Sequence, residues 1–230
     1  MGAGCLFPID TARLHWVPAM TAASSRAVRK SRIADGIFLL RFASQYELAS
    51  TFLRFQEHYE SNRFRNRVFT VEEYMDWYAG TFGAFTYYQD WSGFNVPSSA
   101  LAPFDAGQFD PLLRKEQRLL RLFRGEREPF YVIGIASDAD LEHEIAHALW
   151  YTRPDYRDAV LAAMRPYDTS ALEKRLASMG YHRHVLTDEV HAYLVAPGDL
   201  LEPGKKRLAP LRRELRAIFR KHGAGIKRPA

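Results

Sequence analysis

The segment from residue 130 to residue 154 constrains this chain most, because two elements of opposite kind follow each other almost without a break. The apolar run FYVIGIA predicts a buried or cleft-lining strand, and SDADLEHEIAHALWYTRP follows it directly. Ser137 or Asp138 predicts the start of a helix, and Pro154 predicts its end about four turns later. The chain is therefore expected to contain a sheet and a helix that leaves it within a few residues.

The predicted helix carries two histidines and a glutamate in the pattern H-E-x-x-H, in a chain with only 8 histidines. At about 100° per residue, His143 and His147 lie on one face, and Glu144 stands at the edge of that face. The apolar residues of the helix lie on the opposite face, where a core can take them up: Leu141, Ile145, Ala148 and Leu149. The pattern predicts a helix that presents two imidazoles and a carboxyl group away from the core.

This combination of residue types suits a zinc ion. Two neutral imidazoles one turn apart bind one Zn²⁺, and a neighbouring carboxylate reaches a water on that ion. The ion lowers the pKa of its water towards about 7, and the carboxylate takes the proton. We therefore expect His143 and His147 to be metal ligands and Glu144 to be the general base. The alternative is a solvent-facing helix whose His and Glu are ordinary polar surface.

The rest of the chain alternates irregularly between strand-like and helical patterns. Strands are predicted at residues 37–42 and 82–89, with a loop over residues 90–107. Two capping boxes predict helix starts, Ser44 with Glu47 and Thr70 with Glu73, and the second helix is expected to end at Gly80. A third helix is predicted to start at Asp110 and Pro111 and to end at Gly125. Irregular alternation favours an α+β fold with a small sheet in a single domain.

Charge divides the chain into a body and two ends. Of the net charge of +5, residues 203–230 contribute +9 and residues 1–36 contribute +3, which leaves −7 on residues 37–202. Residues 1–35 show no hydrophobic period and predict an irregular arm, residues 36–202 predict the folded domain, and residues 203–230 predict a basic helix or tail. That helix is expected to dock on the acidic body or to contact an anionic surface.

Composition excludes several classes of protein. An apolar content of 47% with mixed charge excludes a disordered chain. The longest apolar runs have about seven residues, too few for a transmembrane segment. A single cysteine, Cys5, excludes an internal disulfide framework and fits a reducing compartment, so a cytoplasmic location is expected. An acidic body gives no clear sign of nucleic-acid binding.

HEIAH after an apolar strand resembles the active-site helix of the zincin metallopeptidases. The metzincin branch has Gly and a third His at the positions of Trp150 and Arg153, so that branch is excluded. The segment TDEVHAYL (187–194) resembles the second motif of the gluzincin branch. The resemblance implies that Glu189 is the third zinc ligand and that the small Ala192 follows it three residues later. It also implies a zincin-like catalytic domain whose edge strand, 130–136, pairs with an extended substrate.

Two features of this resemblance stay open in the sequence. Gluzincins commonly use a Tyr or His to steady the oxyanion, and Tyr193 lies about 40° from Glu189 on its helix, which makes it a candidate donor. Alternatively, His182 and His184 in GYHRHVL share one side if that segment is a strand, and they would complete a three-histidine site.

We therefore expect a zinc-dependent hydrolase, most simply a metallopeptidase acting on peptide or protein substrates. Zn²⁺ is the expected cofactor, with His143, His147 and Glu189 as ligands and with Glu144 and Tyr193 as catalytic residues. Two alternatives come from other classes of protein. One is an inactive zincin-like protein that binds a peptide or partner, and the other is a nucleic-acid-binding protein that uses its basic tail.

Overall fold

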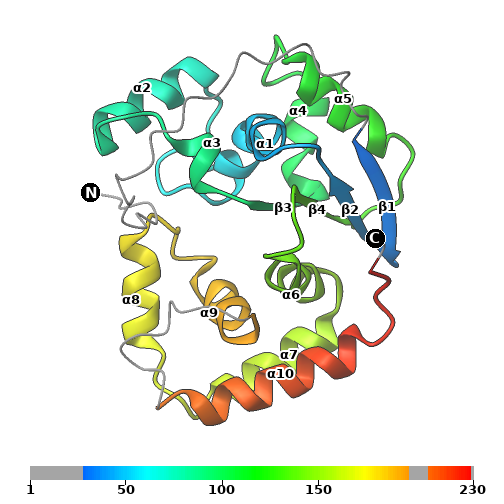
Figure 1. Cartoon of the computed structure of the whole chain (residues 1–230), viewed down its shortest axis with the longest axis vertical. Coiled ribbons are helices and arrows are strands. Elements are labelled where there is room, and N and C mark those ends of the chain that lie inside the picture. Colours follow the sequence, from blue (N-terminus) through cyan, green and yellow to red (C-terminus); the bar gives the residue numbers. More distant parts are fainter. Residues whose placement is uncertain (1–27, 197–206, 229–230) are drawn as a thin grey trace.

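A computed structural model of the chain describes residues 28–196 and 207–228, which fold around one small mixed sheet (Figure 1). The strands are β1 (Arg29–Ala34), β2 (Ile37–Arg41), β3 (Gly93–Pro97) and β4 (Tyr131–Ile135), in the spatial order β1-β2-β4-β3. Strands β2 and β4 are parallel, and the other two pairs are antiparallel. The predicted α+β class with a small sheet is confirmed.

Helices cover both faces of the sheet. Those that come before β4 in the chain are α1 (Gln45–Glu60), α2 (Val71–Phe82), α3 (Tyr87–Asp90), the 3-10 turn η1 (Ser98–Ala100), α4 (Ala102–Asp105) and α5 (Arg114–Phe123). Those that follow β4 are α6 (Leu141–Thr152), α7 (Pro154–Met164), α8 (Ser170–Ser178), α9 (Leu186–Val195) and α10 (Ala209–Gly223). In Figure 1 the first group lies on the side of α1, and the second group lies around α6 on the opposite side.

The two central strands are apolar at nearly every position because both of their faces are buried. Ile37 and Leu39 of β2 belong to the core beneath α6, whereas Phe38 and Leu40 belong to the core beneath α1. Gly134 of β4 lets α1 approach closely, since a Cβ atom there would lie 2.6 Å from the ring of Phe52. The sheet thus separates two cores and holds α1 and α6 on opposite faces.

The expectation that strand 130–136 lies at the edge of the sheet is wrong. Strand β4 lies between β2 and β3, and the edge on this side is formed by β3, in the stretch predicted to be a loop. The reason is visible in the burial pattern. All five residues of β4 are buried, as expected of an interior strand. Any backbone pairing with a substrate would therefore have to use β3.

The boundaries predicted for the two ends are also corrected. Residues 29–34 are not part of an irregular arm: they form β1, whose Ile33 is only 1% exposed. Residues 1–27 lie outside the described residues. Residues 203–230 contain a helix that docks on the body, as expected, because Leu211, Leu215 and Phe219 of α10 are buried in the same core as α6 and α9. The folded domain therefore extends beyond residue 202. No helix in residues 28–196 and 207–228 is both long and apolar enough to cross a bilayer.

Local signals predicted some helix ends well. Ser44 caps α1 by accepting from the backbone N–H of Glu47, and Thr70 and Glu73 form the full capping box of α2. Gly80 does not end α2, which continues to Phe82 and is closed by Gly83 in the left-handed conformation. Capping signals predict a helix start correctly where the hydrogen-bond partner of the capping residue lies within one helical turn.

Two further local predictions are wrong. Residues 82–89 do not form a strand, since α2 continues into this stretch and α3 begins at Tyr87. Helix α5 begins at Arg114 rather than at Pro111, because Glu116 accepts from the Leu113 backbone N–H and binds the buried Arg54 at the same time. That ion pair connects α5 to α1, and no local pattern contains it.

Candidate metal centre

Helix α6 presents its two histidines as the sequence predicted. His147 is 2% exposed and His143 is half-buried, while the opposite face, with Ile145 and Leu149, fills the core beneath the sheet. The predicted helix start is two or three residues too early, since Asp140 is the N-cap and makes no side-chain hydrogen bond there. Pro154 does not simply end the helix: it is the first residue of α7.

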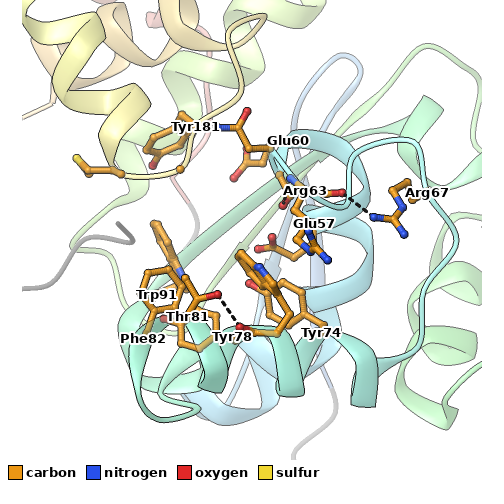
Figure 2. Close-up of a pocket in the computed structure, with 15 residues that line it drawn as sticks. Glu57, Glu60, Arg63, Arg67, Tyr74, Tyr78, Thr81, Phe82, Trp91 and Tyr181 are labelled. Carbon is orange, nitrogen blue, oxygen red and sulfur yellow. Dashed lines mark hydrogen bonds between the residues drawn. The ribbon is translucent and has the colours of Figure 1, made fainter. Parts of the chain in front are cut away.

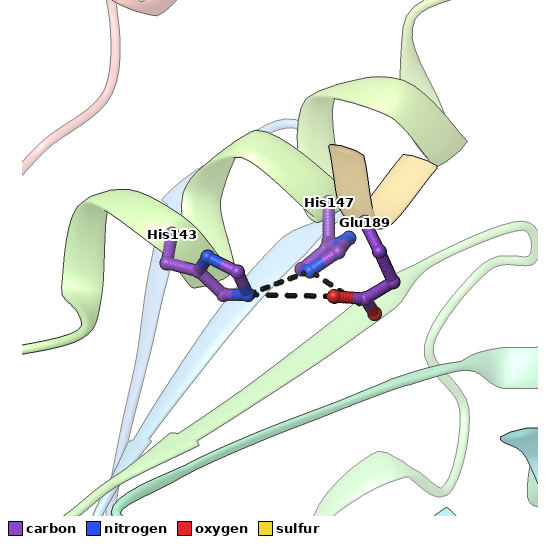
Figure 3. A group of neighbouring side chains, drawn as sticks. All are labelled: His143, His147 and Glu189. Carbon is purple, nitrogen blue, oxygen red and sulfur yellow. Dashed lines mark hydrogen bonds and ion pairs between the residues drawn. The ribbon is translucent and has the colours of Figure 1, made fainter. Parts of the chain in front are cut away.

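Glu189 lies beside these histidines because α9 packs against α6. The ring atom Nε2 of His147 is 3.1 Å from Nε2 of His143 and 3.6 Å from Oε1 of Glu189, and Nε2 of His143 is 3.8 Å from Oε2 of Glu189 (Figure 3). Two ligand atoms bound to one tetrahedral zinc at 2.0–2.1 Å are about 3.3 Å apart. The three side chains therefore have the separation that a zinc ion requires.

The predicted small residue of α9 serves this approach. Ala192 is fully buried against the core shared with α6, and its backbone forms a hydrogen bond with His143. The helix itself begins at Leu186 and has Val185 as its N-cap. Glu189 is 3% exposed and therefore faces the interior of the protein.

Asp188 fixes the tautomer of His147. Its Oδ1 atom lies 3.0 Å from Nδ1 of His147, so Nδ1 carries the proton and Nε2 is free to bind a metal. Asp188 in turn is held by Nδ1 of His191 at 3.1 Å, and Nε2 of His191 lies 2.9 Å from the hydroxyl of Tyr156. This buried chain orients the ligand from behind, which is a usual arrangement in histidine metal sites.

The electrostatics of the cluster favour a cation. Burial and the neighbouring His147 lower the pKa of His143 well below its ordinary value, which leaves it neutral, as a ligand must be. Burial lowers the pKa of His147, but attraction by Asp188 and Glu189 outweighs it and raises the pKa to about 10. Burial raises the pKa of Glu189, and its Oε2 has no hydrogen-bond partner among the described residues. A divalent ion would satisfy this buried atom and compensate the carboxylates, so the residues present fit zinc.

Glu144 is held next to the edge strand. It is 4% exposed, and its Oε2 accepts from Nδ2 of Asn95 at 2.5 Å, while Tyr131 donates to Oδ1 of Asn95. Its Oε1 lies against Gly93, where a Cβ atom would be only 2.3 Å away. Burial raises the pKa of Glu144 to about 7, against smaller opposing effects of His147 and Asn95. A carboxyl group of this kind can take and release a proton near neutral pH.

Comparisons with known protein families, with curated proteins and with solved structures found no match for this chain. The chemistry of the site is therefore argued from its own residues.

Tyr193 lies beside the cluster, as predicted. Its ring packs edge-on against His143 with centroids 4.6 Å apart, and its hydroxyl is 3.2 Å from the hydroxyl of Tyr181. The alternative ligands His182 and His184 do not join the cluster: they bond to each other through Nδ1 atoms at 2.8 Å, and the metal-binding group found in the described residues contains neither. The three-histidine alternative is not supported.

Three residues of the site were missed in the sequence. Asn95 stands in a stretch predicted to be a loop, and Tyr181 precedes the two histidines that attracted attention. Asp188 was not predicted to orient a ligand. A signal for Asp188 exists, since an acidic residue directly before a predicted ligand is a candidate to orient another ligand. For Asn95 and Tyr181 no local signal exists, because their roles depend on contacts across the fold.

Proposed function

We propose that this protein is a zinc-dependent hydrolase of the gluzincin type that cleaves peptide bonds. The observation that carries the proposal is the convergence of His143, His147 and Glu189, from two helices that are distant in sequence, with His147 held in the metal-binding tautomer. These three side chains would hold the ion. Bound zinc would polarise a water and the scissile carbonyl group, and the same ligand set leaves one position open for them.

The remaining steps belong to the protein's own side chains. Glu144 takes the proton of the attacking water and returns it to the leaving amine, as a general base and then a general acid. Asn95 keeps the carboxyl group of Glu144 in place through Oε2. The hydroxyls of Tyr193 and Tyr181, adjacent to each other beside His143, are the donors available to the oxyanion of the tetrahedral intermediate.

Metal analysis of the purified protein tests the proposal. About one zinc per chain is expected, and His143→Ala with His147→Ala should remove it. Glu144→Gln should retain zinc and lose nearly all hydrolysis of a peptide library. Glu142→Gln is a matched control, because Glu142 is on the same helix but contacts Arg228 instead of the cluster. Metal content that is unchanged in the double variant would refute the zinc site.

The same measurements separate an inactive zincin-like binding protein from an enzyme. Zinc that depends on Glu189 and both histidines, together with no turnover of any peptide in the library, would favour the binding protein. Loss of zinc in Glu144→Gln would show that Glu144 is a ligand and that its proposed role as base is wrong.

Nucleic-acid binding is the weaker candidate, because α10 uses part of its surface for docking. Arg212 and Arg216 donate to backbone carbonyl groups at the end of α9. The exposed cations Arg213, Arg220 and Lys221 remain for an anionic surface. Salt-sensitive binding to nucleic acid that disappears when these three are replaced by Ala would support this candidate.

A further inference from the structure

A large cavity of about 780 Å³ opens between α1, α2 and the segment that follows α8 (Figure 2). Its walls are largely aromatic: Tyr74, Trp77, Tyr78, Phe82, Trp91 and Tyr181 line it. Glu57 and Glu60 of α1 also line it, and in Figure 2 they lie between Tyr181 and the aromatic rings of α2. Aromatic rings around carboxyl groups form an environment that attracts organic cations.

The two carboxyl groups have no cation of their own in the described part of the chain. Glu57 is bonded to hydroxyls of Tyr74, Tyr87 and Ser61, and Glu60 is bonded to Gln56. The ion pairs found among described residues include neither glutamate, although two exposed arginines stand at the cavity wall. Burial raises the pKa of both Glu57 and Glu60 to about 7. The charge of His147 partly offsets that of Glu60, whereas no cation is among the groups that lower the pKa of Glu57.

The cavity is connected to the proposed metal centre by short chains of contacts. Glu60 bonds to Gln56, Gln56 accepts from the backbone N–H of Asn95 at 3.2 Å, and Asn95 holds Glu144. On the other side, Tyr181 lines the cavity and bonds to Tyr193, whose ring packs on His143. A ligand in the cavity would thus contact residues that are linked to the reacting groups through one or two side chains.

The edge strand explains why this cavity should matter for recognition. The backbone N–H of Ser98 donates to the carbonyl group of Phe130, the residue before β4, so by alternation the N–H positions of residues 93, 95 and 97 point away from β4. The N–H of Asn95 is already bonded to Gln56, and Pro97 has none. An extended substrate therefore finds few free donors along β3, and affinity has to come from side-chain contacts.

We propose that this cavity binds a basic side chain, lysine or arginine, of a peptide substrate, with Glu57 and Glu60 contacting the cation. The aromatic walls would surround its aliphatic stem and charged end. This inference rests on the proposed function for its placement next to a scissile bond. The cation site itself follows from the cavity and its carboxyl groups.

Binding of matched peptides tests the inference without relying on turnover. Acetylated pentapeptide amides carry arginine, or its neutral isostere citrulline, at each position in turn, on an otherwise Ala/Gly background. Their dissociation constants are measured by calorimetry with the purified full-length protein. We expect at least tenfold tighter binding of the arginine peptide at one position, and a similar preference for lysine over norleucine.

Variants locate the preference. Glu57→Gln with Glu60→Gln should reduce the ratio between arginine and citrulline peptides to nearly one. Glu214→Gln, a control that removes one exposed carboxyl group from α10, should leave the ratio unchanged. Equal binding of charged and neutral peptides by the unmodified protein would overturn the inference, and so would a preference that persists in the double variant.

The same titration on the His143→Ala and His147→Ala protein separates the two proposals. A preference for arginine that persists in this double variant would show that the cation site does not depend on the metal. A parent protein that prefers arginine but holds no zinc and hydrolyses no peptide would leave the cation site standing and refute the proposed function. Zinc and hydrolysis in the parent protein without any preference for a basic residue would support the proposed function and refute the cation site.

Discussion

Replacing Glu57 by Gln should stabilise the protein in alkaline solution. The half-buried carboxyl group has its pKa raised from 4.5 to about 7, chiefly by burial. Between these two values the unfolded chain loses a proton that the folded protein keeps, so the folded state becomes less favourable as the pH rises. A shift of about 2.5 units corresponds to roughly 3 kcal/mol once both states are ionised, at 1.36 kcal/mol per unit.

The amide in Glu57→Gln has nearly the shape of the protonated acid and never ionises. We therefore expect the variant to be more stable than the parent by about 2–3 kcal/mol at pH 8.5 and by close to zero at pH 4.5. Urea unfolding followed by circular dichroism at both pH values measures the two free energies of unfolding. Glu214→Gln, on the exposed side of α10, should show a difference of about 0.5 kcal/mol or less at either pH.

The difference in the free energy of unfolding between variant and parent, and its change with pH, decide whether this reasoning holds. A variant that is less stable than the parent at pH 8.5 would mean that the Glu57 carboxylate is well compensated in the folded protein. That result would also remove a main support for the cation site, which assumes an acid in need of a partner. A stabilising effect of equal size at both pH values would point to a packing change instead of a buried charge.

Three further predictions concern the centre and the sheet. Gly93→Ala adds a methyl group that would collide with Oε1 of Glu144, so zinc content should persist while peptide hydrolysis falls at least tenfold. Unchanged hydrolysis would show that the position of Oε1 is not critical. Asp188→Asn should weaken zinc affinity about 10–100-fold in a competition titration with the fold intact, and unaltered affinity would remove Asp188 from the centre. Ile33→Ala should lower the free energy of unfolding by about 2–5 kcal/mol in urea, and a negligible loss would mean that β1 is dispensable.

The candidate metal centre could be located from the sequence because its first half is local. His143 and His147 are one helical turn apart, and that spacing alone puts them on one face. Glu189 was reachable through the resemblance of its segment to a known second motif. The structure brings all three ligand atoms together, but the same residues say nothing about Asn95 or Tyr181, which act across the fold.

The sheet was predicted only in part for a related reason. The strands around Leu39 and Ile133 are apolar on both faces, which makes them recognisable as strands but also marks them as interior. Strand β3 is short, starts at a glycine and ends at Pro97, so its residues have the composition of a loop. Its strand conformation is stabilised by pairing with β4, and a partner in the sheet is not visible in a local pattern.

The position of β3 changes what kind of substrate suits this site. A strand that pairs with a peptide along its whole edge gains affinity from each added residue, because backbone hydrogen bonds do not depend on side chains. Here Gln56 and Pro97 take away two of the three outward N–H positions of β3. Lengthening a peptide should therefore add little affinity, whereas changing one side chain at the cavity should add or remove much.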